Sequence, residues 1–273
     1  MHLILRYARS VQRLTVELSC CRLGIDADIW LEQLVRHNRA SLRHFKCDHS
    51  VHPIVVFGLT GCAQLQTLLP GSFAPMVPKR ARHVVDCFAK NCRQLEELRL
   101  VGIPDDSVGR FLASGAKTHP SVDCWPTSVF VFAGLKLKSL EVGTLAFKPL
   151  EHLASVSLQG LRRLVFTLTD PASLPYMLRL AEQLSQLPKL NKLELVFNNS
   201  DAKRSAPLEQ AKNVVISLPA LDELVLRLHC DAASGLPRFR APKLRKLRTD
   251  SLQYTHGLVE WLDSFGSTSM LSL

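Results

Sequence analysis

The chain has 273 residues, of which 47% are hydrophobic, so it is long enough to bury a continuous core. No apolar run approaches the roughly 20 residues that a membrane-spanning helix needs, which excludes an integral membrane protein of the helical class. The formal net charge of +10 favours an acidic partner or a loose association with nucleic acid. The distribution of this charge along the chain decides between the two.

The amino-terminal residues and the cysteines bear on the cellular compartment. The eight cysteines are scattered, Cys20 and Cys21 are adjacent, and no secretory signal precedes them, so we interpret them as reduced thiols. This interpretation predicts an intracellular protein, cytoplasmic or nuclear. Three arginines and no acidic residue precede Glu17, which leaves a mitochondrial presequence as an alternative.

A short phrase recurs along the chain in the order apolar, two polar, apolar, polar, apolar. Neighbouring copies lie 23 to 31 residues apart, except for 42 residues between the fourth and fifth copies. Most of these spacings are typical of repeat proteins. The last four positions alternate as they do in a strand. The copies begin at Val11, Leu42, Leu65, Leu95, Leu137, Leu161, Leu190, Leu221 and Leu244.

The segments between the copies contain helix patterns. Asp26 or Asp28 is expected to cap the first helix, which runs through Val35. Two short apolar runs, 53–57 and 129–133, have the length of buried strands. The other predicted helices cover residues 82–91, 174–187 and 210–218.

Alternating strands and helices fit two α/β architectures. A doubly wound sheet commonly enters its strands through glycine-rich loops that hold phosphates. This chain has only 13 glycines and contains neither a GxGxxG nor a GxxxxGKS/T phrase. Short parallel strands that are unstable alone, stacked around one shared core, fit the spacing better. The sequence therefore predicts an α/β solenoid.

The segment 92–105 (CRQLEELRLVGIPD) resembles the leucine-rich repeats of F-box proteins and related ribonuclease-inhibitor-like proteins. In that family a helix ends in cysteine and is followed by LxxLxL, a turn and an acidic residue. Residues 62–65 repeat the cysteine, and a proline variant of the position occurs at 187–190, 218–221 and 241–244. The resemblance covers residues 10–250 and implies that Cys62 and Cys92 are core residues.

The resemblance implies a leucine-rich repeat solenoid, or horseshoe, with short parallel strands on the concave face and helices or irregular turns on the convex face. We expect residues 1–273 to form a single domain of about nine irregular repeats. The segment 104–134 is expected to be an insertion or a degenerate repeat. No F-box is recognisable before the first repeat, and residues 270–273 look like the start of another strand. We therefore expect both ends to be truncated.

The sequence contains no recognisable catalytic motif. It lacks a GxSxG elbow, an HExxH helix and a familiar pair of carboxylates, so we predict a protein that is not an enzyme and uses no cofactor. His44, Cys47, His49 and His52 have the spacing of metal ligands. The first two fall on or beside a predicted strand and the last two in the turn after it, so their donors need not converge, and no metal site is predicted.

The polar residues between the inward leucines are expected to project from the concave face in two rows. Both rows mix charges of opposite sign, whereas a nucleic-acid groove favours a continuous positive stripe with stacking aromatic residues. Leu69, Val165 and Val225 are expected to serve as apolar anchors. The candidate partner-binding residues are Arg13, Lys46, Glu97, Arg99, Glu141, Arg163, Lys192, Glu194, Glu223, Lys246 and Arg248. They share these rows with His44, Thr67, Ser139 and Thr15.

These observations favour a module that recognises another protein and makes no contact with a membrane. The resemblance implies the substrate-recognition part of a ubiquitin ligase, with ligase subunits as further partners. Two alternatives stay open, namely an assembly scaffold without a link to ubiquitin, and a binder of nucleic acid or an anionic surface. Segment 78–82 (PKRAR) also fits a nuclear localisation signal, whereas core leucines interrupt the basic segment 243–248.

Overall fold

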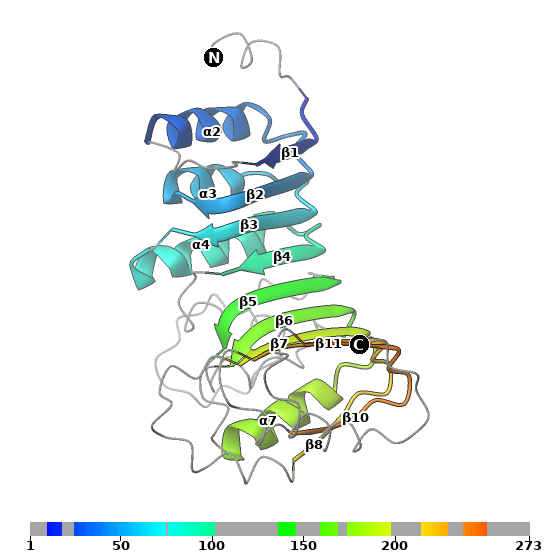
Figure 1. The fold of residues 1–273 in the computed structure, drawn as a ribbon. Coiled ribbons are helices and arrows are strands. Elements are labelled where there is room, and N and C mark those ends of the chain that lie inside the picture. The colour runs from blue at the N-terminus through cyan, green and yellow to red at the C-terminus, as the bar shows by residue number, and fades with distance from the viewer. Residues whose placement is uncertain are drawn as a thin grey trace, which may run out of the picture. The chain divides into compact units, whose positions relative to one another are not determined.

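All nine copies of the repeated phrase form a β-strand, and each strand begins at the third position of its phrase (Figure 1). The strand predicted for each copy is therefore confirmed. The nine strands are β1 (Arg13–Val16), β2 (His44–Val51), β3 (Thr67–Phe73), β4 (Glu97–Leu100), β5 (Ser139–Leu145), β6 (Arg163–Leu168), β7 (Lys192–Phe197), β9 (Glu223–Leu228) and β11 (Lys246–Thr249).

The computed structural model describes residues 10–17, 25–74, 76–101, 136–145, 159–168, 174–197, 214–228 and 237–249. The chain divides into two units, Met1–Gly143 and Thr144–Leu273. Both contain parallel strands and at least one helix, which confirms a mixed α/β fold. No helix among the described residues is long and apolar enough to cross a membrane. The segments 104–134 and 270–273, for which we expected an insertion and a further strand, lie outside the described residues.

In the first unit, strands β1 to β5 lie side by side in chain order, and neighbours pair in parallel. The fourth residues of the five phrases fall in one row across these strands, and four of them are buried completely or nearly so. This row forms the core side of the strands, as the alternating pattern predicts. Its members are Leu14, which is partly exposed, and the buried Phe45, Leu68, Leu98 and Leu140.

Three helices lie along one side of these strands (Figure 1). They are α2 (Ile25–His37), α3 (Pro53–Leu59) and α4 (Pro78–Asn91), and α3 contacts both of the others. α2 begins at Ile25, so Asp26 and Asp28 lie in its first turn instead of capping it. Their carboxylates still interact favourably with the positive end of the helix dipole there. α4 begins four residues before the predicted 82, because a proline suits the first turn of a helix.

The segment 53–57 is a helix, and our expectation of a buried strand there was wrong. The Nδ1 atom of His52 accepts a hydrogen bond from the Ile54 backbone N–H at 3.3 Å and thereby caps the helix. Pro53 follows in the first turn, where its missing N–H has no partner to lose. Val55, Val56 and Leu59 are buried. An apolar run of this length does not distinguish a strand from a buried helical turn, so the capping residues decide.

In the second unit, β6, β7, β9 and β11 pair in parallel. Their fourth-position residues, Leu164, Leu193, Leu224 and Leu247, form a fully buried row. Helix α7 (Leu174–Ser185) lies where residues 174–187 predict a helix. The same phrase therefore builds the same core row in both units.

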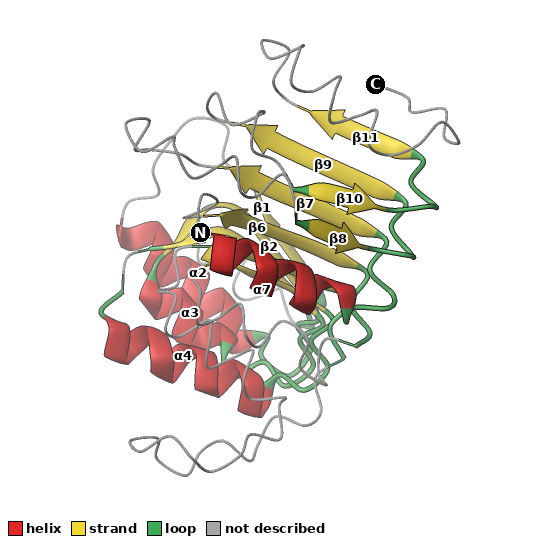
Figure 2. Ribbon diagram, turned by 90° about the horizontal axis from the view of Figure 1, so that it is seen from below, coloured by secondary structure: helices red, strands yellow, loops and turns green. Residues whose placement is uncertain are grey.

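The helix predicted over 210–218 is contradicted by the structure. Residues 210–213 lie outside the described part, and β8 (Val215–Ser217) follows them. β8 pairs in parallel with β10 (Arg238–Arg240), which brings the buried Ile216 and Phe239 side by side. Figure 2 shows β8 between α7 and β10. The run Val214, Val215, Ile216 is β-branched, so it favours an extended backbone over a helix.

The turn before the phrase is described for six copies, and it is the same in five of them. In each of these five the backbone N–H of the first apolar residue donates to the carbonyl oxygen three residues earlier, at 3.0–3.2 Å. The cysteine and proline versions of the repeat are thus one structural element with interchangeable side chains. The five accepting residues are Cys62, Cys92, Leu187, Leu218 and Ala241.

Within each unit, a second backbone contact joins each copy to the next. The carbonyl oxygen at the second position of a phrase accepts from two consecutive N–H groups of the following copy, at 2.7–3.0 Å. This two-donor contact fixes where each strand begins relative to its predecessor. The accepting residues are Gln12, Arg43, Gln66 and Glu96 in the first unit and Arg162, Asn191 and Asp222 in the second.

Cys62 and Cys92 are fully buried, which confirms their prediction as core residues. The Cys92 thiol donates to the Cys62 carbonyl oxygen at 3.4 Å. Burial raises the pKa of both thiols to about 12. A nucleophilic cysteine needs a lowered pKa and access to solvent, so both thiols are structural.

Candidate functional site

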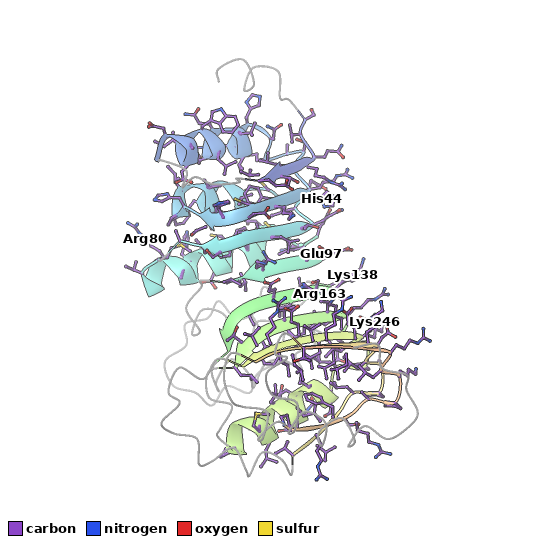
Figure 3. All side chains as sticks on the ribbon, viewed as in Figure 1. His44, Arg80, Glu97, Lys138, Arg163 and Lys246 are labelled. Atoms are coloured by element: carbon purple, nitrogen blue, oxygen red, sulfur yellow. The ribbon has the colours of Figure 1, made fainter. Side chains whose placement is uncertain are left out.

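The side chains at the third position of each phrase form a row on the outward side of the strands. Strand pairing aligns these residues within each unit as the sequence predicts. In Figure 3, His44 and Glu97 of the first unit lie on the strand side, whereas Arg80 lies on the helix side. The first unit contributes Arg13, His44, Thr67, Glu97 and Ser139, and the second contributes Arg163, Lys192, Glu223 and Lys246.

The fifth positions form a neighbouring row on the same side. We call the third- and fifth-position side chains of a unit its polar strand face. Pairing aligns Thr15, Lys46 and Leu69, and separately Arg99 and Glu141, in the first unit. In the second unit the row is Val165, Glu194, Val225 and Arg248.

The first unit's polar strand face is held by contacts between neighbouring strands. Arg99 forms an ion pair with Glu141 at 2.9 Å and donates to the Pro70 carbonyl oxygen at 3.4 Å. His44 and Thr67 share a hydrogen bond of 3.1 Å. Lys46 and Glu97 are exposed, so this face combines anchored and solvent-facing charges.

On the polar strand face of the second unit, each acidic residue contacts two basic residues. Glu223 receives a hydrogen bond from Lys192 at 2.9 Å and pairs with Arg248 at 3.6 Å. Glu194 accepts from Arg227 at 2.7 Å and lies 3.9 Å from Arg163. These contacts connect four neighbouring strands into one charged surface.

Arg227 was not among the predicted residues, but it contacts Glu194, so we include it in the polar strand face of the second unit. It lies two residues beyond Val225, at the next outward position of β9, and pairing aligns it with Val196. The six-residue phrase ends before this position, but the alternation of the sequence LVLRL continues through it. Extending the alternation by one step would have identified it.

Three residues differ from their expected accessibility. Val165 and Val225 are only 6% exposed, so they are buried and are not available as anchors, whereas Leu69 is partly exposed. The side chain of Glu194 is 12% exposed, and its carboxylate is engaged by Arg227. Valine is shorter than the arginine, lysine and glutamate side chains on adjacent strands, which can cover it.

The four metal-ligand candidates have separate surroundings. His49 lies within β2, and our expectation that it falls in the turn after the strand was wrong. Cys47 is buried, and His52 caps α3. Within the described ranges, no group of three or more His, Cys, Asp or Glu side chains is placed to hold a metal ion.

The ion pairs of the second unit predict a measurable pH effect. The hydrogen bond from Lys192 lowers the pKa of Glu223, with further lowering by the charges of Lys192, Arg248 and Lys246 against the opposing effect of burial. A lowered folded-state pKa stabilises the protein above the unfolded-state value, and that stabilisation disappears as the pH falls through the folded-state value. We expect Lys192→Met to move the Glu223 pKa upward in a carbon-detected NMR titration.

The matched control is Lys189→Met, which removes an exposed charge from the turn before the same strand. It should leave the pKa of Glu223 nearly unchanged. Equal shifts in both variants would mean that general charge, and not the Lys192 contact, sets the Glu223 pKa.

Comparison with known proteins gives no assignment for this arrangement. A scan against models of protein families finds no match to the chain, and a search of curated proteins finds no significant match.

Proposed function

We propose that this chain is a leucine-rich repeat protein whose polar strand faces bind another protein. The recurrence of one strand, one turn and one two-donor backbone contact supports the repeat assignment. The main support for binding is the set of ion pairs on the second unit's polar strand face. These contacts hold side chains 31 and 33 residues apart in the sequence in defined positions before any partner arrives.

A pre-ordered polar face suits recognition for two physical reasons. Side chains that are already held lose less conformational freedom on binding, so more of the contact energy appears as affinity. Charges of both signs in a fixed pattern favour a complementary partner and repel others. The face therefore provides selectivity without requiring any chemical step.

The test is affinity capture that compares two charge-reversed variants with the original chain. Lys246→Glu combined with Arg248→Glu alters the polar strand face of the second unit. Arg238→Glu combined with Arg240→Glu makes the same change of charge on β10, where both residues are also exposed. We expect a specific set of proteins to be retained by the original chain and the β10 variant and lost from the face variant.

Circular dichroism should first establish that both variants fold. If the face variant retains the same proteins as the original chain at moderate salt, the proposed binding face is wrong. The ubiquitin-ligase role implied by the resemblance is tested in the same capture, since it requires a ligase adaptor or a cullin among the retained proteins. Retained partners without such subunits would favour the assembly scaffold instead.

A further inference from the structure

Acidic and basic side chains occupy different depths on the polar strand face of the second unit. The side chains of Glu194 and Glu223 are 12% and 15% exposed, whereas those of Arg227 and Arg248 are 46% and 64% exposed. Lys246 is also exposed. The carboxylates therefore lie close to the strands, and the cationic groups extend beyond them toward solvent.

The basic residues also outnumber the acidic residues that they contact. The Glu223 carboxylate interacts with the positive charges of Lys192, Arg248 and Lys246. Its single negative charge offsets only one of these three positive charges. Because three cations share the Glu223 carboxylate, the described residues around Glu223 carry an excess of positive charge on their solvent-facing side.

The composition of the face favours a protein ligand over nucleic acid. Among the described residues of β6, β7, β9 and β11, no aromatic side chain occupies the third or fifth position, so bases have no stacking platform there. The two carboxylates would also repel a continuous phosphate backbone. Separate carboxylates on a peptide can contact the basic side chains individually and form charge-assisted hydrogen bonds.

We infer that the polar strand face of the second unit binds an acidic protein segment, with Lys246 and Arg248 as its principal contacts. This inference rests on the proposed function and specifies the chemistry of the partner. Lys192 and Lys246 occupy one row and are separated by β9, so their backbones are about 10 Å apart. In a polyproline II segment, which has three residues per turn, carboxylates three residues apart lie on the same side and about 9 Å apart. The preferred ligand therefore carries acidic residues at every third position.

Fluorescence anisotropy with three labelled probes tests this inference on the full chain. The first is a 12-residue peptide with glutamate at every third position and glycine or serine elsewhere. The second has lysine in place of each glutamate, and the third is a single-stranded oligonucleotide with the same formal charge as the first. We expect the glutamate peptide to bind tightest.

The variants locate the binding site. Lys246→Glu with Arg248→Glu should weaken binding of the glutamate peptide by about tenfold or more, which corresponds to about 1.4 kcal/mol. Lys246→Gln with Arg248→Gln should weaken it in the same direction and guards against misfolding caused by the reversed charges. Arg238→Glu with Arg240→Glu should change the affinity less than about twofold, because β10 is outside the polar strand face.

Each other outcome overturns the inference. Equal or tighter binding of the oligonucleotide would identify a general polyanion surface, and preference for the lysine peptide would show that the carboxylates dominate. Equal losses of affinity for the glutamate peptide in the face and β10 variants would show that the net charge of the chain alone attracts the peptide. If captured proteins still depend on Lys246 and Arg248 while the glutamate peptide does not bind, the proposed function stands and this inference fails. If neither the capture of proteins nor the binding of the glutamate peptide depends on these residues, the proposed function and this inference both fail.

Discussion

Replacing Phe45 with alanine should lower the free energy of unfolding of the first unit by about 3 to 5 kcal/mol. Phe45 is completely buried in β2 and lies in register between Leu14 of β1 and Leu68 of β3. Removing the ring leaves a cavity between the flanking strands β1 and β3, and because β2 is paired with both, the chain can close this cavity only in part. Urea unfolding followed by circular dichroism measures the loss.

The control for this prediction is Lys46→Ala, one residue further along the same strand and exposed on its opposite side. It should change the unfolding free energy by less than about 0.5 kcal/mol. Similar losses in the two variants would contradict the assignment of the fourth position of each phrase to the core. Phe45→Leu should lose less than Phe45→Ala because it refills part of the cavity.

Replacing Gly71 with alanine should destabilise the first unit by about 1 to 3 kcal/mol or more, although it adds only one methyl group. The pairing of β2 with β3 shifts between Cys47 and Ser50, so that two residues of β2 face one residue of β3. Gly71 lies opposite this bulge. A Cβ atom there would stand 2.3 Å from the Asp48 carbonyl oxygen and 2.9 Å from the His49 nitrogen. Both are backbone atoms, so no side-chain rotation relieves the clash.

Gly61→Ala is the matched control for this substitution. Its nearest neighbour outside the adjacent residues would be the Gly58 carbonyl oxygen at 3.4 Å, which is close to ordinary contact. The change should be nearly neutral, since alanine also reduces the freedom of the unfolded chain. Differential scanning calorimetry of the two variants compares them directly. Equal melting temperatures would mean that the bulge can move away from β3 without cost.

The strands were predictable because their signal repeats. Each copy places a leucine or phenylalanine at the fourth position, and this period of two, repeated nine times, defines both the strand and its buried side. The turn before the strand was harder to recognise, because Cys62 and Ala241 have little in common as side chains. They share only a backbone hydrogen bond, which the sequence does not display.

The connections between strands were less predictable, and the two errors have different causes. Residues 53–57 look like a strand in isolation, but the cap from His52 starts a helix. Residues 210–218 have a helical spacing of apolar residues, but the β-branched run 214–216 favours an extended backbone, and β10 supplies its parallel neighbour from more than twenty residues away. The first error came from overlooking a capping residue, and the second from weighing apolar spacing above β-branching.

The sequence predicted which residues align in rows on the candidate binding face, but not which of their side chains are exposed. The rows follow from the pairing register, so the lateral neighbours of Glu223 could be written down from the sequence. Which charges remain exposed depends on side-chain length and on contacts across strands. Glu194 is covered while Arg248 is not, although both occupy the fifth position of their phrases.

The two-donor backbone contact gives the chain a means of changing length. Within each unit, the same carbonyl position of one copy accepts the two hydrogen bonds from the next copy, whatever side chains either copy carries. Duplication or loss of a whole copy by recombination would join identical acceptors to identical donors and leave the remaining register intact. The charge pattern of the polar strand face could then be lengthened or reordered one strand at a time, because the backbone contact stays the same while the outward side chains change.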